Sequence, residues 1–186
     1  MSTFFTDEDT ELKRLSFKLK NMIVKIKILE DIPQLSLGKK NIGPFKKDDI
    51  IELRLWQAIP LIEEGKAELK EFPINVSYTD IYKYVWKETQ IPEIQELKNM
   101  SYMGLKHGEK LKKMTKENIE KFKIALRDLI TVRTGKIIKL SMQNSELSTS
   151  TKSLLPEEKI LYKYLSKILS TWKRRVLEGE KHEYED

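Results

Sequence analysis

The stretch Ile42-Gly43-Pro44-Phe45, followed after four polar residues by Ile50-Ile-Glu-Leu-Arg-Leu-Trp-Gln-Ala58, decides the fold. A Gly-Pro pair marks a tight turn, and the apolar run from Leu35 to Leu37 before it predicts a short strand. The apolar segment after the turn predicts a strand or helix entry that continues into a short helix. We therefore expect Trp56 to be a core residue that packs near Phe45.

The flanking segments predict strands around this turn. Val24, Ile26 and Ile28 alternate with lysines, which is the period of a strand with one buried face. Residues 67 to 72 alternate again, and Pro73 marks their end. The sequence thus predicts a small β-rich domain at residues 21–74, preceded by an N-terminal arm at residues 1–20 with weak helical spacing.

The chain after Ser77 has helical patterns. Ser77 or Thr79 can cap one helix, and Thr115 can cap a long one whose apolar stripe has spacings of three and four. A last helix is expected to begin near Pro156, after a polar, low-complexity connection at residues 141–153. These patterns predict an α-helical domain at residues 78–179 and an acidic tail at residues 180–186, hence an α+β fold with a β-rich domain before a larger helical bundle.

The amino-acid composition excludes several kinds of chemical site. The 186 residues include 35 Lys and Arg against 29 Asp and Glu, giving a net charge of +6, and no cysteine. This excludes disulfides, thiolate zinc sites and a cysteine nucleophile. No apolar run approaches the roughly 20 residues that span a bilayer, and the N-terminus lacks the pattern of a signal peptide, so we expect a soluble, intracellular protein without membrane contact.

The sequence contains no motif typical of an enzyme. It lacks a phosphate-binding loop, a dinucleotide fingerprint and a paired-histidine metal motif. We therefore predict no catalytic residues, no cofactor and no metal. A hydrolase of unknown type is a minor alternative.

Arg133 lies on the apolar stripe of the predicted long helix. An unpaired buried charge costs several kcal/mol, so the guanidinium should meet a carboxylate or carbonyl groups, or lie at a subunit contact. The alternative is an arginine whose stem packs while its head reaches solvent. Asp128 is about 140° around the helix and is not its natural partner.

Two basic clusters and one aromatic cluster leave nucleic-acid binding open. The lysine clusters are Lys39, Lys40, Lys46 and Lys47, and Lys106, Lys110, Lys112, Lys113 and Lys116 with His107. Either could meet DNA phosphates, but acidic residues interleave with the wider sequence and no aromatic platform accompanies either cluster, so a solvated lysine face is the simpler interpretation. The cluster Tyr78, Tyr82, Tyr84 and Trp86 has spacing that suits packing in a core or interface. A DNA-binding or regulatory helical protein is thus the alternative to a scaffold.

The two motifs together resemble subunits of GINS, the accessory complex of the replicative DNA helicase. The first match is the Gly-Pro-Phe turn with the apolar-Trp-x-Ala segment, and the second is Asp, four residues, Arg, two residues, Lys and an apolar residue. The matching residues are Gly43, Pro44, Phe45, Leu55, Trp56, Ala58, Asp128, Arg133, Lys136 and Ile137. The chain departs from the family pattern at Arg54, where proline is frequent, and at Gln57, where leucine is frequent.

The resemblance implies a non-enzymatic scaffold that helps to assemble and activate the MCM helicase in chromosome replication. The order of the domains, small domain first, is similar to the Psf-two and Psf-three class. Implied partners are a second type of GINS subunit, in a 2:2 heterotetramer in archaea, the MCM ring, and a RecJ-like phosphoesterase-fold factor. The implied location is the cytoplasm, near the nucleoid, in archaea, or the nucleus in eukaryotes.

The last predicted helix has an apolar face wider than two or three helices can bury mutually. Its candidate residues for contact with another subunit are Leu161, Leu165, Ile168 and Trp172.

Overall fold

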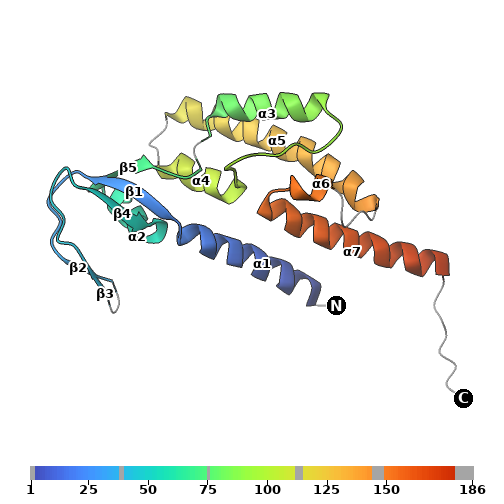
Figure 1. The fold of residues 1–186 in the computed structure, drawn as a ribbon, viewed down its shortest axis with the longest axis horizontal. Helices are drawn as coiled ribbons and strands as arrows, with labels where there is room; N and C mark the ends of the chain where they lie inside the picture. The colour runs from blue at the N-terminus through green and yellow to red at the C-terminus, as the bar shows by residue number, and fades with distance from the viewer. Residues whose placement is uncertain (1–2, 38–39, 75, 112–114, 144–148, 179–186) are drawn as a thin grey trace, which may run out of the picture. The chain divides into compact units, whose positions relative to one another are not determined.

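The computed structural model describes residues 3–37, 40–74, 76–111, 115–143 and 149–178. It has an α+β fold, with the strands in the N-terminal part and a helical bundle after them (Figure 1). The elements in chain order are α1 (Thr3–Lys20), β1 (Ile23–Ile28), β2 (Leu35–Leu37), β3 (Lys40–Ile42), β4 (Ile50–Arg54), α2 (Leu55–Glu63), β5 (Ala67–Glu71), α3 (Tyr78–Gln90), α4 (Tyr102–Leu111), α5 (Lys116–Met142), α6 (Thr149–Lys152) and α7 (Pro156–Glu178).

The chain forms two compact units. The sheet unit comprises Lys13–Val76 and Asn99–Ile119, and the bundle unit comprises Met1–Leu12, Ser77–Lys98 and Glu120–Asp186. Helix α1 replaces the arm that was expected to have only weak helical spacing; its residues up to Leu12 belong to the bundle unit and those from Lys13 to the sheet unit.

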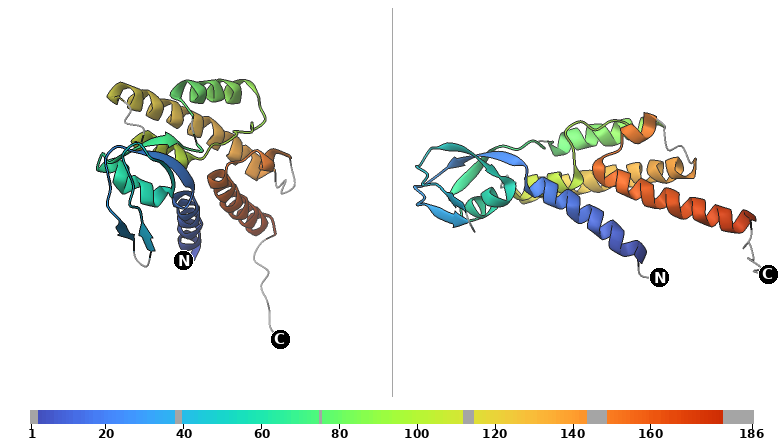
Figure 2. Two further views of the ribbon diagram at one scale, coloured as in Figure 1. Left: turned by 60° about the vertical axis from the view of Figure 1, so that its left-hand side comes forward. Right: turned by 60° about the horizontal axis from the view of Figure 1, so that its bottom comes forward.

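The sheet unit is built on a three-stranded antiparallel sheet in the order β4-β1-β5. The alternation predicted for β1 is present, because Val24, Ile26 and Ile28 are buried while the lysines between them are partly exposed. Helix α2 supplies the other side of this core through Leu55, Ala58, Leu61 and Ile62. Strands β2 and β3 form a separate antiparallel pair (Figure 2).

The expectation that Trp56 is a core residue is wrong. Its side chain is 42% exposed, whereas Leu55 and Ala58 on either side are fully buried. The buried positions of α2 follow the helical period from Leu55, and the next residue lies about 100° around the helix from it. The apolar character of the segment was a correct signal of a packed helix, but it did not show which residues face inward.

This geometry gives opposite predictions for two adjacent residues. Leu55→Ala should lower the free energy of unfolding by about 2 to 5 kcal/mol, because it leaves a cavity in the core. Trp56→Ala should lower it by less than about 1 kcal/mol, because the indole is partly in water. Urea unfolding followed by circular dichroism measures both. Equal losses for the two variants would contradict the placement of Trp56.

The predicted Gly-Pro turn is present, and its backbone conformation at position 43 favours glycine. Gly43 has a φ of +86°, in the left-handed region that side-chain-bearing residues avoid. After the turn, the backbone of Phe45 exchanges two hydrogen bonds of 2.9 Å with that of Ile32. The turn thereby returns the chain toward β1 before β4 begins.

Helix α4 belongs to the sheet unit, which differs from the predicted helical domain at residues 78–179. The reason lies in two glycines that let α4 approach the end of β5 closely. A Cβ atom at Gly104 would lie 2.0 Å from Cδ1 of Ile74, and one at Gly108 would lie 3.3 Å from Cε1 of Phe72. Sequence patterns did not reveal this contact because each glycine alone looks like a helix breaker.

In the bundle unit, α3 and α5 lie side by side (Figures 1 and 2). The buried face of α5 consists of Phe122, Ala125, Leu129, Arg133, Ile137 and Ser141, at the predicted spacings of three and four. The predicted polar connection at residues 141–153 is shorter than expected, since α5 runs to Met142 and α6 occupies Thr149–Lys152. Residues 144–148 and the predicted tail at 180–186 lie outside the described residues.

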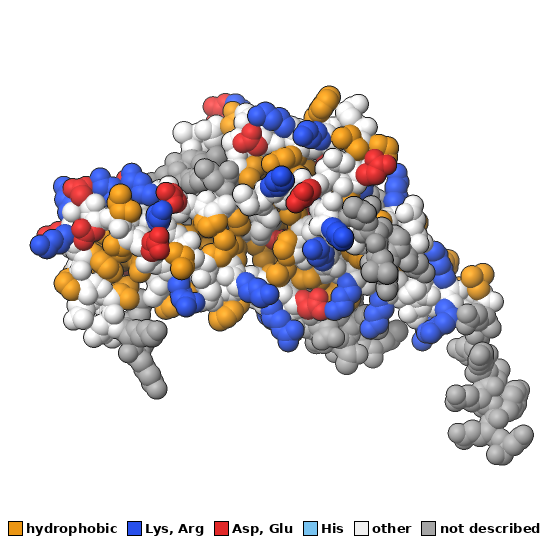
Figure 3. Space-filling view, viewed as in Figure 1, with side chains coloured by type: hydrophobic (Ala, Val, Ile, Leu, Met, Phe, Trp, Pro, Cys, Tyr) orange, Lys and Arg blue, Asp and Glu red, His pale blue; other side chains and the backbone are white. Residues whose placement is uncertain are grey.

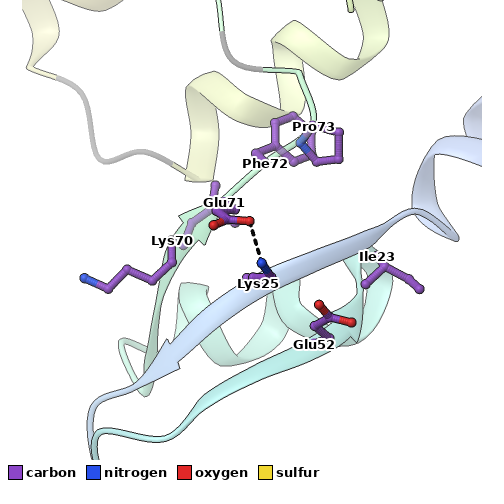
Figure 4. A pocket seen from close by; sticks show the side chains of 8 residues that line it. Ile23, Lys25, Glu52, Lys70, Glu71, Phe72 and Pro73 are labelled. Carbon is purple, nitrogen blue, oxygen red and sulfur yellow. Dashed lines mark ion pairs between the residues drawn. The ribbon is translucent and has the colours of Figure 1, made fainter.

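The face of the three-stranded sheet away from α2 is charged. Lys25 of β1 lies opposite Glu52 of β4 and Glu71 of β5, and its Nζ is 2.9 Å from the Glu71 carboxylate (Figure 4). This hydrogen bond to Glu71 raises the pKa of Lys25. Glu52 and Glu71 both line a shallow pocket on this face, and Lys25 pairs with Glu71 there.

Candidate subunit interface

Arg133 is the centre of a buried ionic cluster in the bundle unit. Its side chain is fully buried, and its Nε and Nη2 atoms donate to the two carboxylate oxygens of Glu158 at 2.6 and 2.7 Å. This two-point geometry is the strongest form of arginine–carboxylate pairing. Of the two expectations for Arg133, pairing with carboxylates holds, and the arginine that reaches solvent does not.

Glu88 of α3 provides the second carboxylate. It accepts hydrogen bonds from the Nη1 atom of Arg133 and from Nζ of Lys136, and it is fully buried. Lys136 also donates to the carbonyl oxygens of Ile91 and Glu93, at 2.7 and 2.9 Å. The two basic residues of the second family motif, Arg133 and Lys136, therefore anchor both α3 and the segment after it to α5.

The cluster also stabilises the start of α7. The backbone N–H of Leu155 donates to Glu158 at 2.8 Å, which satisfies an N–H group at the helix N-terminus. Nη2 of Arg133 donates to the carbonyl oxygen of Ser153 at 3.2 Å. Every carboxylate oxygen of Glu88 and Glu158 accepts at least one hydrogen bond. We therefore assign the cluster a structural role. The cluster fixes the positions of α3, α5 and α7, and hence the outer surfaces of these helices.

The N-terminus of α3 has the predicted cap. The Ser77 hydroxyl donates to the Asp80 carboxylate at 2.6 Å, and the backbone N–H of Asp80 donates back to that hydroxyl at 3.2 Å. The side-chain hydrogen bond from Ser77, followed by that from Lys83, lowers the pKa of Asp80. A carboxyl group with a lowered pKa adds stability above its unfolded pKa, and this stability is lost as the pH falls through the folded pKa.

Ser77→Ala should therefore have two effects. It should lower the free energy of unfolding by about 1 kcal/mol, the usual loss on removing an N-cap. It should also raise the pKa of Asp80 toward its ordinary value, because the first cause of the shift is gone. Chemical denaturation and an NMR pH titration of the Asp80 carboxyl carbon measure these effects. An unchanged Asp80 titration would contradict the assignment of this hydrogen bond.

The four candidate contact residues of α7 are in two environments. Leu161 and Leu165 are partly buried and pack against the unit's own core of Ile94, Ile137 and Leu154. Ile168 and Trp172 are 52% and 59% exposed. Val176 continues the same stripe and is also exposed, and Lys173 beside it donates to the carbonyl oxygen of Met142 at 3.0 Å. The exposed apolar stripe of α7 is thus Ile168, Trp172 and Val176.

Two further helices present apolar side chains to solvent. On α3, Tyr82 and Trp86 are 40% and 66% exposed, while Tyr78 and Tyr84 of the same aromatic cluster are partly buried. On α5, Ile124, Ile138 and Met142 are exposed on the side away from Arg133. An exposed apolar surface of this extent is typical of a protein that contacts another protein.

The predicted basic clusters are only partly described. Lys46, Lys47, Lys106 and Lys116 are exposed, while the side chains of Lys40 and Lys110 and all of Lys39, Lys112 and Lys113 lie outside the described residues. On the face drawn in Figure 3, acidic and basic side chains occur together over the strand-bearing part, with hydrophobic areas between them. In this face the lysines do not form one continuous positive surface.

The other residues of the two family motifs differ in their burial. Phe45 is partly buried, and Leu55 and Ala58 are in the core of the sheet unit. Asp128 is exposed on α5, and Ile137 is buried beside Arg133. Sequence reasoning missed Glu88 and Glu158 as partners of Arg133. Their helical positions, on the apolar side of α3 and in the first turn of α7, were the available signal.

The described ranges contain neither a metal-binding cluster nor a membrane-spanning helix. Within them, no group of three or more His, Asp or Glu side chains is arranged to hold a metal ion. None of their helices combines the length and hydropathy that a membrane span requires.

The comparisons with known proteins give one family. The family model of the GINS complex protein helical bundle domain matches residues 66–177, which is more than half of the 186 residues. No curated protein matches the chain. The matched segment contains the ionic cluster and the exposed surfaces of α3, α5 and α7. The chain therefore belongs to the GINS complex protein family.

Proposed function

We propose that the chain is a non-enzymatic scaffold subunit of a GINS complex, which assembles and activates the MCM replicative helicase. The observation that carries the proposal is the exposed apolar stripe of α7, Ile168, Trp172 and Val176, inside the segment that matches the family. A tryptophan at the centre of such a stripe is the residue type that most frequently dominates binding energy at protein interfaces. We place the contact with another GINS subunit there, with Leu161 and Leu165 supporting it from within.

The proposed mechanism is thermodynamic linkage. A protein that binds the assembled form of a helicase more tightly than its separate parts raises the fraction that is assembled, without any chemical step. The ionic cluster contributes by holding α3, α5 and α7 in fixed positions, so that little conformational entropy is lost on binding.

The order of the elements supports the finer assignment. The strands precede the bundle, as in the Psf-two and Psf-three class, and we place the chain in that class, with a second subunit type in a 2:2 heterotetramer if the source is archaeal. We propose an intracellular location, with MCM and a RecJ-like phosphoesterase-fold factor as further partners. The partly exposed Trp56 of the sheet unit is a candidate for one of these contacts.

The test uses the complex with its cognate GINS partner. The purified complex should raise the ATPase or unwinding rate of the cognate MCM helicase and should hydrolyse no nucleotide itself. Trp56→Ala, made in the same complex, should reduce the stimulation while leaving the complex assembled, because it lies outside the bundle. A complex that neither binds MCM nor stimulates it at micromolar concentrations would contradict the proposed function.

The alternative of direct DNA binding has its own signature. It requires duplex affinity that falls steeply with added salt, because lysine–phosphate contacts release counterions. Measuring duplex binding of the same complex at two salt concentrations separates the two functions. Strong, salt-sensitive binding without any effect on MCM would favour the DNA-binding alternative.

A further inference from the structure

Helix α3 carries two exposed aromatic side chains and two exposed lysines on one face. Tyr82 and Trp86 are 40% and 66% exposed, and each is followed in the sequence by an exposed lysine, Lys83 or Lys87. Together with Thr79, these four residues line an open hollow of about 440 Å³. This volume lies within the range of about 300–1,000 Å³ that is typical of ligand sites.

The four side chains form two parallel rows along the helix. Residues four apart in an α-helix are separated by about 6 Å along the axis and by about 40° around it. Tyr82 and Trp86 therefore make an aromatic row. Lys83 and Lys87 make a lysine row with the same spacing, about 100° further around the helix. Each turn of this face thus pairs one flat ring with one positive charge.

The pattern continues one turn toward the start of α3. Tyr78, four residues before Tyr82, is partly buried, and Nζ of Lys121 on α5 lies 6.0 Å from the centre of its ring. A cation therefore accompanies the aromatic side chain in this turn as well, and here it comes from the neighbouring helix.

The lysine row is accessible to an anionic ligand. The side chain of Lys83 is 74% exposed, and its Nζ lies 3.0 Å from the Asp80 carboxylate, a surface ion pair that contributes little energy. Lys87 forms no ion pair with any of the described residues. The other carboxylate of α3, Glu88, is buried in the ionic cluster. The exposed face of α3 is therefore positive on balance.

We propose that this face of α3 binds single-stranded nucleic acid, with successive bases stacked on Tyr82 and Trp86 and phosphates at Lys83 and Lys87. Aromatic side chains beside a positive row are the usual means by which proteins bind single strands without reading their sequence. A single strand offers one flat base and one negative phosphate in every unit, which is the repeat that the two rows match. An acidic protein segment would pair with the lysines but has no flat ring in every unit. The proposal does not depend on the assembly function.

The aromatic row is tested by the fluorescence anisotropy of a labelled oligothymidine titrated with the full chain. Trp86→Ala should weaken binding by at least about 5-fold, because one base loses its stacking partner. Trp86→Phe should stay within about threefold of the parent, because it keeps an aromatic face. Trp56→Ala, which removes an exposed tryptophan of the sheet unit, is the control and should bind as the parent does. Circular dichroism should show little change in the melting of Trp86→Ala, since its indole is mostly exposed.

The lysine row is tested by the salt dependence of the same binding. For a single strand, each lost phosphate contact should reduce the slope of log K against log salt concentration by about 0.7. The double variant Lys83→Ala and Lys87→Ala should therefore reduce the slope by roughly 1.4. The double variant Lys139→Ala and Lys159→Ala removes the same charge from exposed positions elsewhere in the bundle unit and should leave the slope nearly unchanged. Oligouridine should bind within about threefold of oligothymidine, because both strands offer bases and phosphates.

Three results would overturn the inference. A chain that binds no oligothymidine at micromolar concentrations and low salt has no such site. Equal affinity for oligothymidine and for a duplex of the same length, with no loss in Trp86→Ala, would show attraction by charge alone. If the parent binds an acidic, tyrosine-containing peptide in place of oligothymidine, and Trp86→Ala loses that binding, the occupant is a protein segment.

Discussion

Arg133→Met should lower the free energy of unfolding of the bundle unit by about 3 to 5 kcal/mol, the cost of leaving buried charges without their partner. Glu158 would lose both hydrogen bonds from the guanidinium, and Glu88 would keep only Lys136 and the Gln95 backbone N–H. Neither carboxylate is accessible to water, so solvation cannot replace what is lost. Chemical denaturation of the chain, alone and in its complex, measures the effect.

Arg127→Met is the matched control on the same helix, because Arg127 is exposed and the substitution is identical. It should change the free energy of unfolding by no more than about 0.5 kcal/mol. A double-mutant cycle with Glu158→Gln should show that the effects of losing Arg133 and Glu158 are not additive, as expected for groups in one network. Additive losses would contradict the direct pairing.

Trp172→Ala should weaken association with the cognate GINS partner by at least about 2 kcal/mol, or roughly 30-fold in Kd, as truncation of a central interface tryptophan commonly does. The indole is 59% exposed in the chain, so its removal should change the chain's own stability by less than about 1 kcal/mol. Isothermal titration calorimetry with the partner and denaturation of the chain alone separate the two quantities.

Arg174→Ala is the control on α7, since Arg174 is exposed and lies on the side of the helix away from the stripe. It should leave the Kd within about threefold of the parent's. If Trp172→Ala and Arg174→Ala bind the partner as tightly as the parent, the interface on α7 is misplaced.

Local patterns predicted much of the fold. The alternation of β1, the cap at Ser77 and the apolar stripe of α5 depend on neighbours within a few residues, and all three are present. The expectations that differ from the structure depend on contacts between segments distant in the sequence. The packing of Gly104 and Gly108 of α4 against residues near β5 has no local signature, and the sequence therefore placed α4 with the other helices.

The partners of Arg133 were also beyond the reach of local sequence patterns. Burial of an arginine on an apolar stripe predicts that it needs a carboxylate, but Glu88 and Glu158 lie 45 and 25 residues away along the chain, and many other acidic residues were equally available. For Trp56, the apolar composition of α2 was a weaker guide than its helical period, which places Leu55 and Ala58 inward. The stripe of α7 was found because its period was read over several turns, although only its second half proved to be exposed.

Sedimentation of the chain, its cognate GINS partner and their mixture tests the central claim most directly. If the exposed stripe of α7 is a subunit interface, the mixture should sediment as a stable complex larger than either chain, and Trp172→Ala should shift it back toward the separate species. A chain that remains a stable monomer in the presence of its partner would contradict the assignment of this protein as a subunit that acts through assembly.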